Sequence, residues 1–162
     1  MQIYILRHGK AERVAADGSD AGRELTPEGA QGVRAVLERA RGVRVAPDLI
    51  LASPLVRAGQ TAEIAGERLS YRGKIERTGA LSPSASPYDI WEELRLRKAE
   101  AGSVLLVTHQ PLMGHLIAFL LDSPSLEVEV DTAALTAIRE EAMGAEPRGV
   151  LEWLLTPELA GE

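Results

Sequence analysis

The chain has 162 residues, of which 45% are hydrophobic and 26% are charged, and its formal net charge is -6. These values are ordinary for a globular protein, and the length predicts one domain over residues 1–162. The negative charge argues against nucleic acid or an anionic membrane as partner, and the absence of cysteine excludes disulfides and thiolate metal sites.

Two features of the chain favour the cytoplasm. No apolar run reaches the about 20 residues that a transmembrane helix needs. Arg7 and His8 follow the first apolar run too soon for a signal peptide. We therefore expect a soluble, cytoplasmic protein without a membrane partner.

The first 42 residues predict a strand, a loop and a helix. The apolar run at 2–6 is typical of a central strand that is covered on both faces. Residues 10–25 are polar and rich in Gly, Asp and Ala, which indicates a loop. Thr26 and Pro27 then signal a helix start, because threonine can cap and proline suits the first helical position. We expect this helix to end near Gly42.

The middle of the chain repeats the alternation of strand and helix. We expect strands at 49–52 and 74–77, with a helix at 55–69 between them. A loop is expected at 78–87 and a further helix at 88–101.

The last third of the chain starts with its clearest strand, at 103–109, which is followed by a helix at 112–121. Two β-rich segments, at 134–139 and 150–155, have no helix between them and predict an antiparallel hairpin at an edge. Strands that alternate with helices indicate a mostly parallel sheet between two helical layers. The predicted fold is therefore an α/β sandwich of three layers.

Polar side chains follow three of the predicted strands. In open α/β sheets, ligands bind beyond the carboxyl ends of the strands, so these side chains are expected to converge at one rim. A lone histidine or arginine at such a place is more often structural or solvated, but four of them at equivalent strand ends favour a functional site. The four are Arg7, His8, Arg57 and His109.

The residue types at this rim indicate a phosphoryl ligand. The arginine fork binds phosphate oxygens in bidentate fashion. No carboxylate pair accompanies the histidines, so we expect no metal and no other cofactor. The Gly-rich signature of a P-loop is absent. His115 lies in the middle of a predicted helix, and we give it no functional role.

Four segments resemble the signatures of the histidine phosphatase superfamily, which has the phosphoglycerate mutase-like fold. They are "LRHGK", "RELTPEG", "LASPLVRAGQTA" and "LVTHQP", and their order and spacing also agree. The short chain and "VTHQPLMGHL" are most similar to SixA-type phosphohistidine phosphatases.

The resemblance implies a role for each site residue. His8 would be the nucleophile that carries a covalent phosphoryl group, and as a neutral imidazole it would have one nitrogen held by a backbone acceptor. Arg7, Arg57 and His109 would surround the phosphoryl oxygens. Arg23 would reach the site from the loop, and Gly9 would let the backbone approach closely.

One departure from the family pattern bears on the substrate. Many members place an acidic general acid after the third strand, where this chain has "TGALSPSASP" without a carboxylate. Glu76 and Asp89, on either side, match that position poorly. An alkoxide is a bad leaving group, whereas phosphohistidine departs as imidazole, whose conjugate acid has a pKa of about 6.5.

We therefore expect a phosphatase that acts on phosphohistidine of a signalling or phosphocarrier protein and releases inorganic phosphate. A short chain without large insertions should leave the site open to such a substrate. The alternatives are a phosphatase of small phosphate esters and, from another class, an inactive phosphate-binding module.

Overall fold

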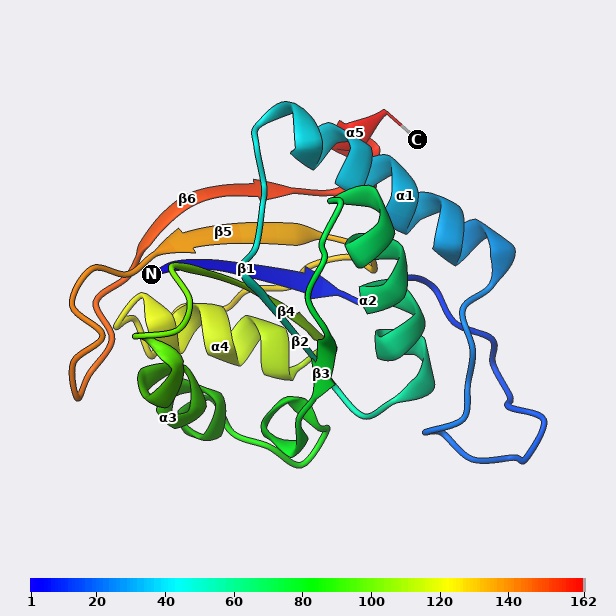
Figure 1. Cartoon of the computed structure of the whole chain (residues 1–162). Coiled ribbons are helices and arrows are strands. Elements are labelled where there is room, and N and C mark those ends of the chain that lie inside the picture. The colour runs from blue at the N-terminus through cyan, green and yellow to red at the C-terminus, as the bar shows by residue number, and fades with distance from the viewer. Residues whose placement is uncertain (162) are drawn as a thin grey trace.

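The computed structural model describes residues 1–161 and contains a six-stranded sheet (Figure 1). The strand order is β3-β2-β4-β1-β5-β6. The strands are β1 (Gln2–Arg7), β2 (Leu49–Ala52), β3 (Ile75–Arg77), β4 (Ser103–Thr108), β5 (Leu135–Arg139) and β6 (Val150–Leu155).

The three strands whose ends carry the predicted site residues are parallel neighbours. β4 lies between β2 and β1, and it pairs in parallel with both. The register places Arg7 opposite Thr108 and Ala52 opposite Val107, so the three strands end at the same level. The predicted convergence of their carboxyl ends is confirmed.

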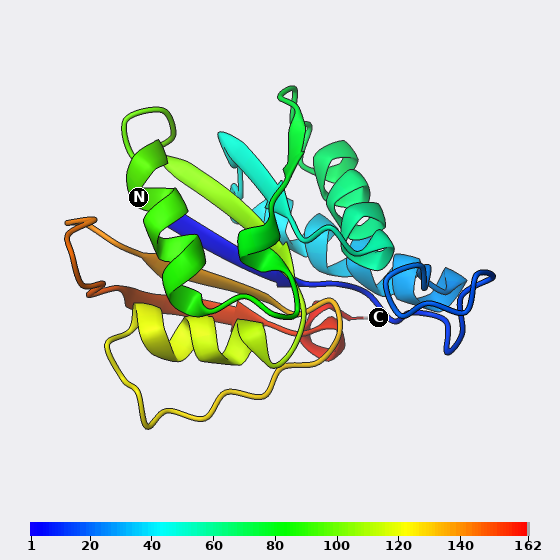
Figure 2. The ribbon, with the colours of Figure 1, turned by 90° about the horizontal axis from the view of Figure 1, so that it is seen from below.

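Helices cover both faces of the sheet, as the alternating pattern predicts (Figure 2). Two apolar clusters form the core, one on each face. One cluster joins the sheet to α3 (Pro87–Arg97) and α4 (Leu112–Leu120). The other joins it to α1 (Pro27–Gly42), α2 (Val56–Arg68) and the short α5 (Pro157–Ala160).

The start of α1 follows the predicted capping chemistry. The hydroxyl of Thr26 accepts a hydrogen bond of 2.9 Å from the Gly29 amide, and Pro27 is the first helical residue. Val33, Val36 and Leu37 are buried against the sheet, and Gly42 is the last helical residue. Cap and apolar face together fix the direction in which the chain leaves the loop after β1.

The C-terminal strands form the expected antiparallel hairpin. β5 pairs with β1 and β6 pairs with β5, both antiparallel, so β6 is an edge strand. The fold is thus an α/β sandwich of three layers with a mixed sheet.

Three local predictions differ from the structure. The expected loop at 78–87 contains a 3-10 turn, η1 (Gly79–Leu81), because the Thr78 hydroxyl accepts from the Ala80 amide and Leu81 is completely buried. α3 ends at Arg97 and not at residue 101, since 98–100 form a turn that leads toward β4. The sequence pattern did not predict α5, which is four residues long.

Every helix in the described residues 1–161 is too short or too polar to cross a membrane.

Candidate active site

His8 lies directly after β1 and is held in one tautomer. Its Nδ1 lies 2.7 Å from the carbonyl oxygen of Gly9, and since a carbonyl can only accept, Nδ1 carries the proton. In the neutral ring, Nε2 therefore carries a lone pair and no proton. The residue is 8% exposed. This geometry matches the requirement for a histidine that attacks phosphorus through Nε2.

Arg57 contacts His8 from the first turn of α2. Its Nε donates to His8 Nε2 at 3.2 Å, which is possible only because this nitrogen carries no proton. The carbonyl of Arg57 accepts from the Thr61 hydroxyl at 2.8 Å, and the same hydroxyl accepts from the Gly9 amide at 3.2 Å. Thr61 thus ties the backbone after β1 to the turn of α2 that carries Arg57.

The surroundings of His8 keep it neutral at ordinary pH. The pKa of His8 is lowered from 6.5 to about 4, and burial is the largest cause. The hydrogen bond to the Gly9 carbonyl acts in the opposite direction, whereas the charges of Arg57 and Arg7 lower the pKa further. A neutral imidazole is the form that can act as a nucleophile.

The lowered pKa predicts a loss of stability in acid that depends on His8. The unfolded chain binds a proton at His8 near pH 6.5 and the folded chain only near pH 4, so this contribution is complete above pH 6.5 and is lost as the pH falls toward 4. A shift of this size corresponds to about 3 kcal/mol. Urea unfolding should show that the free energy of unfolding falls more steeply between pH 6.5 and pH 4 in the wild type than in His8→Asn. Parallel curves for the two proteins would contradict the lowered pKa.

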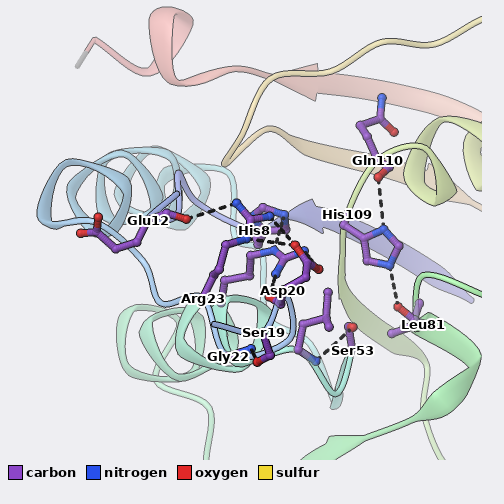
Figure 3. Close-up of polar contacts among 12 residues, drawn as sticks. His8, Glu12, Ser19, Asp20, Gly22, Arg23, Ser53, Leu81, His109 and Gln110 are labelled. Atoms are coloured by element: carbon purple, nitrogen blue, oxygen red, sulfur yellow. Dashed lines mark hydrogen bonds and ion pairs between the residues drawn. The ribbon is translucent and has the colours of Figure 1, made fainter. Parts of the chain in front are cut away.

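Asp20 joins Arg57 to Arg23. Its side chain accepts from Arg57 Nη2 at 3.2 Å, and its main-chain carbonyl accepts from Arg57 Nη1 at 2.8 Å. Arg23 Nη2 lies 2.8 Å from the other carboxylate oxygen of Asp20 (Figure 3). The hydrogen bond from Arg57 lowers the pKa of Asp20, which is therefore ionised. The loop brings Arg23 into the network of His8 and Arg57 through this carboxylate.

Arg7 is the last residue of β1 and is half-buried. Its Nη1 donates to the carbonyl of Val130, and its Nε has no hydrogen-bond partner among the described residues. Burial lowers the pKa of Arg7 while Asp131 and Glu129 partly offset this, and the guanidinium stays protonated. Arg7 also borders a groove of about 790 Å³ that Gln110 and His115 help to line.

His109 follows β4 and is 4% exposed. Its Nε2 lies 3.2 Å from the carbonyl oxygen of Leu81 in η1, and its Nδ1 lies 3.3 Å from the Gln110 carbonyl oxygen (Figure 3). The backbone amide of His8 donates to the Thr108 carbonyl, which keeps the two histidines on adjacent strand ends. His109 is thus next to His8, but its ring nitrogens engage backbone carbonyls.

The structure gives Gly9 a packing role against α1. A Cβ at Gly9 would lie 2.6 Å from the carbonyl oxygen of Gly29, and one at Gly29 would collide with the Lys10 backbone. The chain after β1 therefore crosses the first turn of α1 at backbone contact distance, which only glycine allows. This close approach is to α1, and the expected approach of the Gly9 backbone to the substrate stays a prediction.

Sequence reasoning found most of the network but missed Asp20 and Thr61. Asp20 is one of several polar residues in a loop with no periodic pattern, and Thr61 lies within an ordinary helical pattern. Only the packing of the loop on α2 brings them to Arg57. Within residues 1–161, no group of three or more His, Asp or Glu side chains is placed to hold a metal ion.

The fold and these contacts define a class of protein. It is an α/β protein in which a buried, neutral histidine and arginines gather at the carboxyl ends of parallel strands. Such a set can bind a tetrahedral oxyanion and present a nucleophilic nitrogen to it.

Comparisons with known proteins agree with this class. A profile of the histidine phosphatase superfamily, branch 1, matches residues 3–82. Phosphohistidine phosphatase SixA of Escherichia coli K12 is 31% identical over 97% of this chain and 94% of its own length. The SixA homolog of Haemophilus influenzae is 34% identical over 74% of this chain and 77% of its own length.

A solved structure shows the same relation. The structure of the protein histidine phosphatase SixA complexed with tungstate superimposes with a TM-score of 0.84 at 31% identity, over 97% of both chains. The chain belongs to the histidine phosphatase superfamily. The expected fold and family are confirmed.

Proposed function

We propose that this chain, acting as one domain, removes the phosphoryl group from phosphohistidine on a protein. The observation that carries the proposal is the state of His8, which is buried and neutral with the Nε2 lone pair facing an arginine. Two relatives bear the name phosphohistidine phosphatase SixA or SixA homolog, which supports the same substrate class. The cytoplasmic location expected from the sequence is part of the proposal.

The proposed reaction has two steps. In the first, His8 Nε2 forms a bond to phosphorus while the bond from phosphorus to the substrate's imidazole nitrogen breaks. The other nitrogen of the substrate's ring already carries a proton, so the imidazole leaves as a neutral ring. In the second, water attacks the phosphorylated His8, releasing inorganic phosphate and restoring the free histidine. Both steps require charge stabilisation and alignment more than proton transfer from the protein.

The arginines and His109 are proposed to bind the phosphoryl oxygens. Arg57 already touches Nε2, so small rotations of its guanidinium would bring its donors to an oxygen on the phosphorus under attack. Arg7 Nε is buried and has no hydrogen-bond partner among residues 1–161, so this donor is not yet engaged. His109 is adjacent through the pairing of β1 with β4. Arg23 would contribute from the loop once it is released from Asp20.

The carboxylates near β3 are poorly suited to protonate a leaving group. Glu76 forms two hydrogen bonds with Arg97, at 2.7 and 3.2 Å, and the bond from Arg97 lowers the pKa of Glu76. Asp89 accepts from the amide and hydroxyl of Ser86 at the start of α3, which lowers its pKa too. Both groups are ionised and engaged in structural contacts. This favours a substrate whose leaving group needs no strong acid.

A phosphatase of small phosphate esters is the second candidate, and the observation in its favour is Asp20. This carboxylate lies in the arginine network and is the type of group that could protonate an alcohol. Its pKa is lowered by the hydrogen bond from Arg57, which makes it a weak proton donor. The lowered pKa of Asp20 therefore favours phosphohistidine over small phosphate esters as the substrate.

Leaving-group chemistry separates the two candidates. We expect rapid cleavage of a phosphohistidine protein, slow cleavage of aryl phosphates and almost none of alkyl phosphates, because an unassisted alkoxide is a poor leaving group. Glu76→Gln and Asp89→Asn should change the phosphohistidine rate by less than about twofold. The measurement is kcat/KM for each substrate at one pH.

The outcome that favours the ester phosphatase is also clear. It is a rate of ester cleavage that depends only weakly on the basicity of the alcohol, together with the loss of this ester cleavage when one carboxylate is replaced by its amide. A phosphohistidine rate below that of the alkyl esters would likewise reject the proposal.

A further inference from the structure

Asp20 occupies the arginine donors that a phosphoryl group would need. Its carboxylate accepts from Arg57 Nη2 at 3.2 Å through one oxygen, and from Arg23 Nε at 3.0 Å and Nη2 at 2.8 Å through the other. Figure 3 shows Asp20 next to Arg23 and His8. A carboxylate and a phosphoryl group are both oxyanions that bind guanidinium forks in bidentate fashion, so they compete for the same nitrogens.

Every nitrogen of the two guanidinium groups has an acceptor in this state. Arg57 donates through Nε to His8, through Nη1 to the Asp20 carbonyl and through Nη2 to the Asp20 carboxylate. The remaining nitrogen of Arg23, Nη1, donates to the Glu12 carbonyl at 3.1 Å. The lone pair that His8 needs for attack also accepts one of these hydrogen bonds. This is therefore a resting arrangement, from which Arg57 and His8 must be released.

The carboxylate is the part of this arrangement that exchanges most easily. The side chain of Arg57 is 6% exposed, whereas that of Asp20 is 63% exposed, and an ion pair with an exposed partner contributes little. The loop is anchored by its main chain, because the Val56 amide donates to the Ala21 carbonyl and Arg57 Nη1 donates to the Asp20 carbonyl. The Asp20 side chain can leave the arginines without detaching the loop.

We propose that Asp20 is a stand-in anion that holds Arg57 and Arg23 together until the phosphoryl group of the substrate replaces its carboxylate. The proposal rests on the proposed function, since it takes the site to bind a phosphoryl group. Asp20 keeps two neighbouring cations from repelling each other in the free enzyme. It also competes with inorganic phosphate after hydrolysis and so promotes release of the product.

The test uses Asp20→Asn, which removes the charge and keeps the main-chain carbonyl that accepts from Arg57. The probe is tungstate, a tetrahedral oxyanion, with the dissociation constant measured by titration calorimetry on the full chain. We expect Asp20→Asn to bind tungstate about fivefold more tightly than the wild type, because an exposed ion pair no longer competes. Asp20→Ser should show the same direction. A merely structural role for Asp20 would weaken binding.

The matched control is Glu12→Gln on the same loop. Glu12 contacts Arg23 only through its main-chain carbonyl, so this variant removes one negative charge and no arginine contact. Its tungstate affinity should stay within about twofold of the wild type. Unchanged or weaker tungstate binding in both Asp20 variants, or equally tighter binding in Glu12→Gln, would overturn the proposed role of Asp20. Neither result would contradict the proposed function. A wild-type protein that neither bound tungstate nor cleaved phosphohistidine would overturn the proposed function as well.

Discussion

Replacing His8 with alanine is expected to reduce the turnover of phosphohistidine on the order of 10⁴-fold or more, because the variant has no atom that can carry the phosphoryl group. Arg57 and Arg7 would remain in place, so the variant should still bind an oxyanion. Steady-state assays with a phosphohistidine protein give the rate, and calorimetry with tungstate tests the binding. Loss of both together would point to a folding defect, which the unfolding midpoint would reveal.

A trapping experiment identifies directly the residue that carries the phosphoryl group. Mixing wild-type protein with substrate and quenching without acid should yield a phosphorylated peptide that contains His8, found by mass spectrometry. His115→Ala is the control, because His115 is an exposed residue of α4 outside the network of His8 and Arg57. That variant should give the same phosphopeptide. A phosphoryl group trapped on His109, or on Ser53 directly after β2, would show that another residue is the nucleophile.

Replacing Arg57 with lysine should lower kcat on the order of 10²-fold, similar to the loss of one oxyanion donor. The positive charge is kept, but the guanidinium donates in three directions, to His8 and to two oxygens of Asp20. A single ammonium cannot reproduce this planar fork. We therefore expect kcat to fall because the positive charge of the lysine is misplaced. The free energy of unfolding should change less than the activation free energy.

Arg41→Lys is the matched control for this substitution. Arg41 is in the last turn of α1, its side chain is 54% exposed, and it contacts Glu38 at 3.7 Å. Its kcat should equal that of the wild type. If Arg57→Lys also retained the wild-type kcat, Arg57 would have no role in catalysis despite its position at the convergent strand ends.

The site residues divide according to the kind of signal that marks them in the sequence. Arg7, His8, Arg57 and His109 could be predicted because strand patterns are strong, and polar residues at the carboxyl ends of parallel strands fall at one rim. Asp20 could not be predicted, because it reaches Arg57 only through the fold of a long loop on α2. The role of Gly9 against Gly29 likewise depends on a contact between distant segments.

The layers, the order of elements and the capped start of α1 could be predicted from the amino-acid order, since periodicity and capping are local properties of a segment. The protonation states of the site residues, in contrast, depend on contacts that form only in the folded chain. The tautomer of His8 depends on the Gly9 carbonyl, its pKa of about 4 depends mainly on burial, and the charge of Asp20 is fixed by Arg57. Solvation and Coulomb interactions act between groups that are close in space, whatever their separation along the chain, so they exist only once the chain has folded.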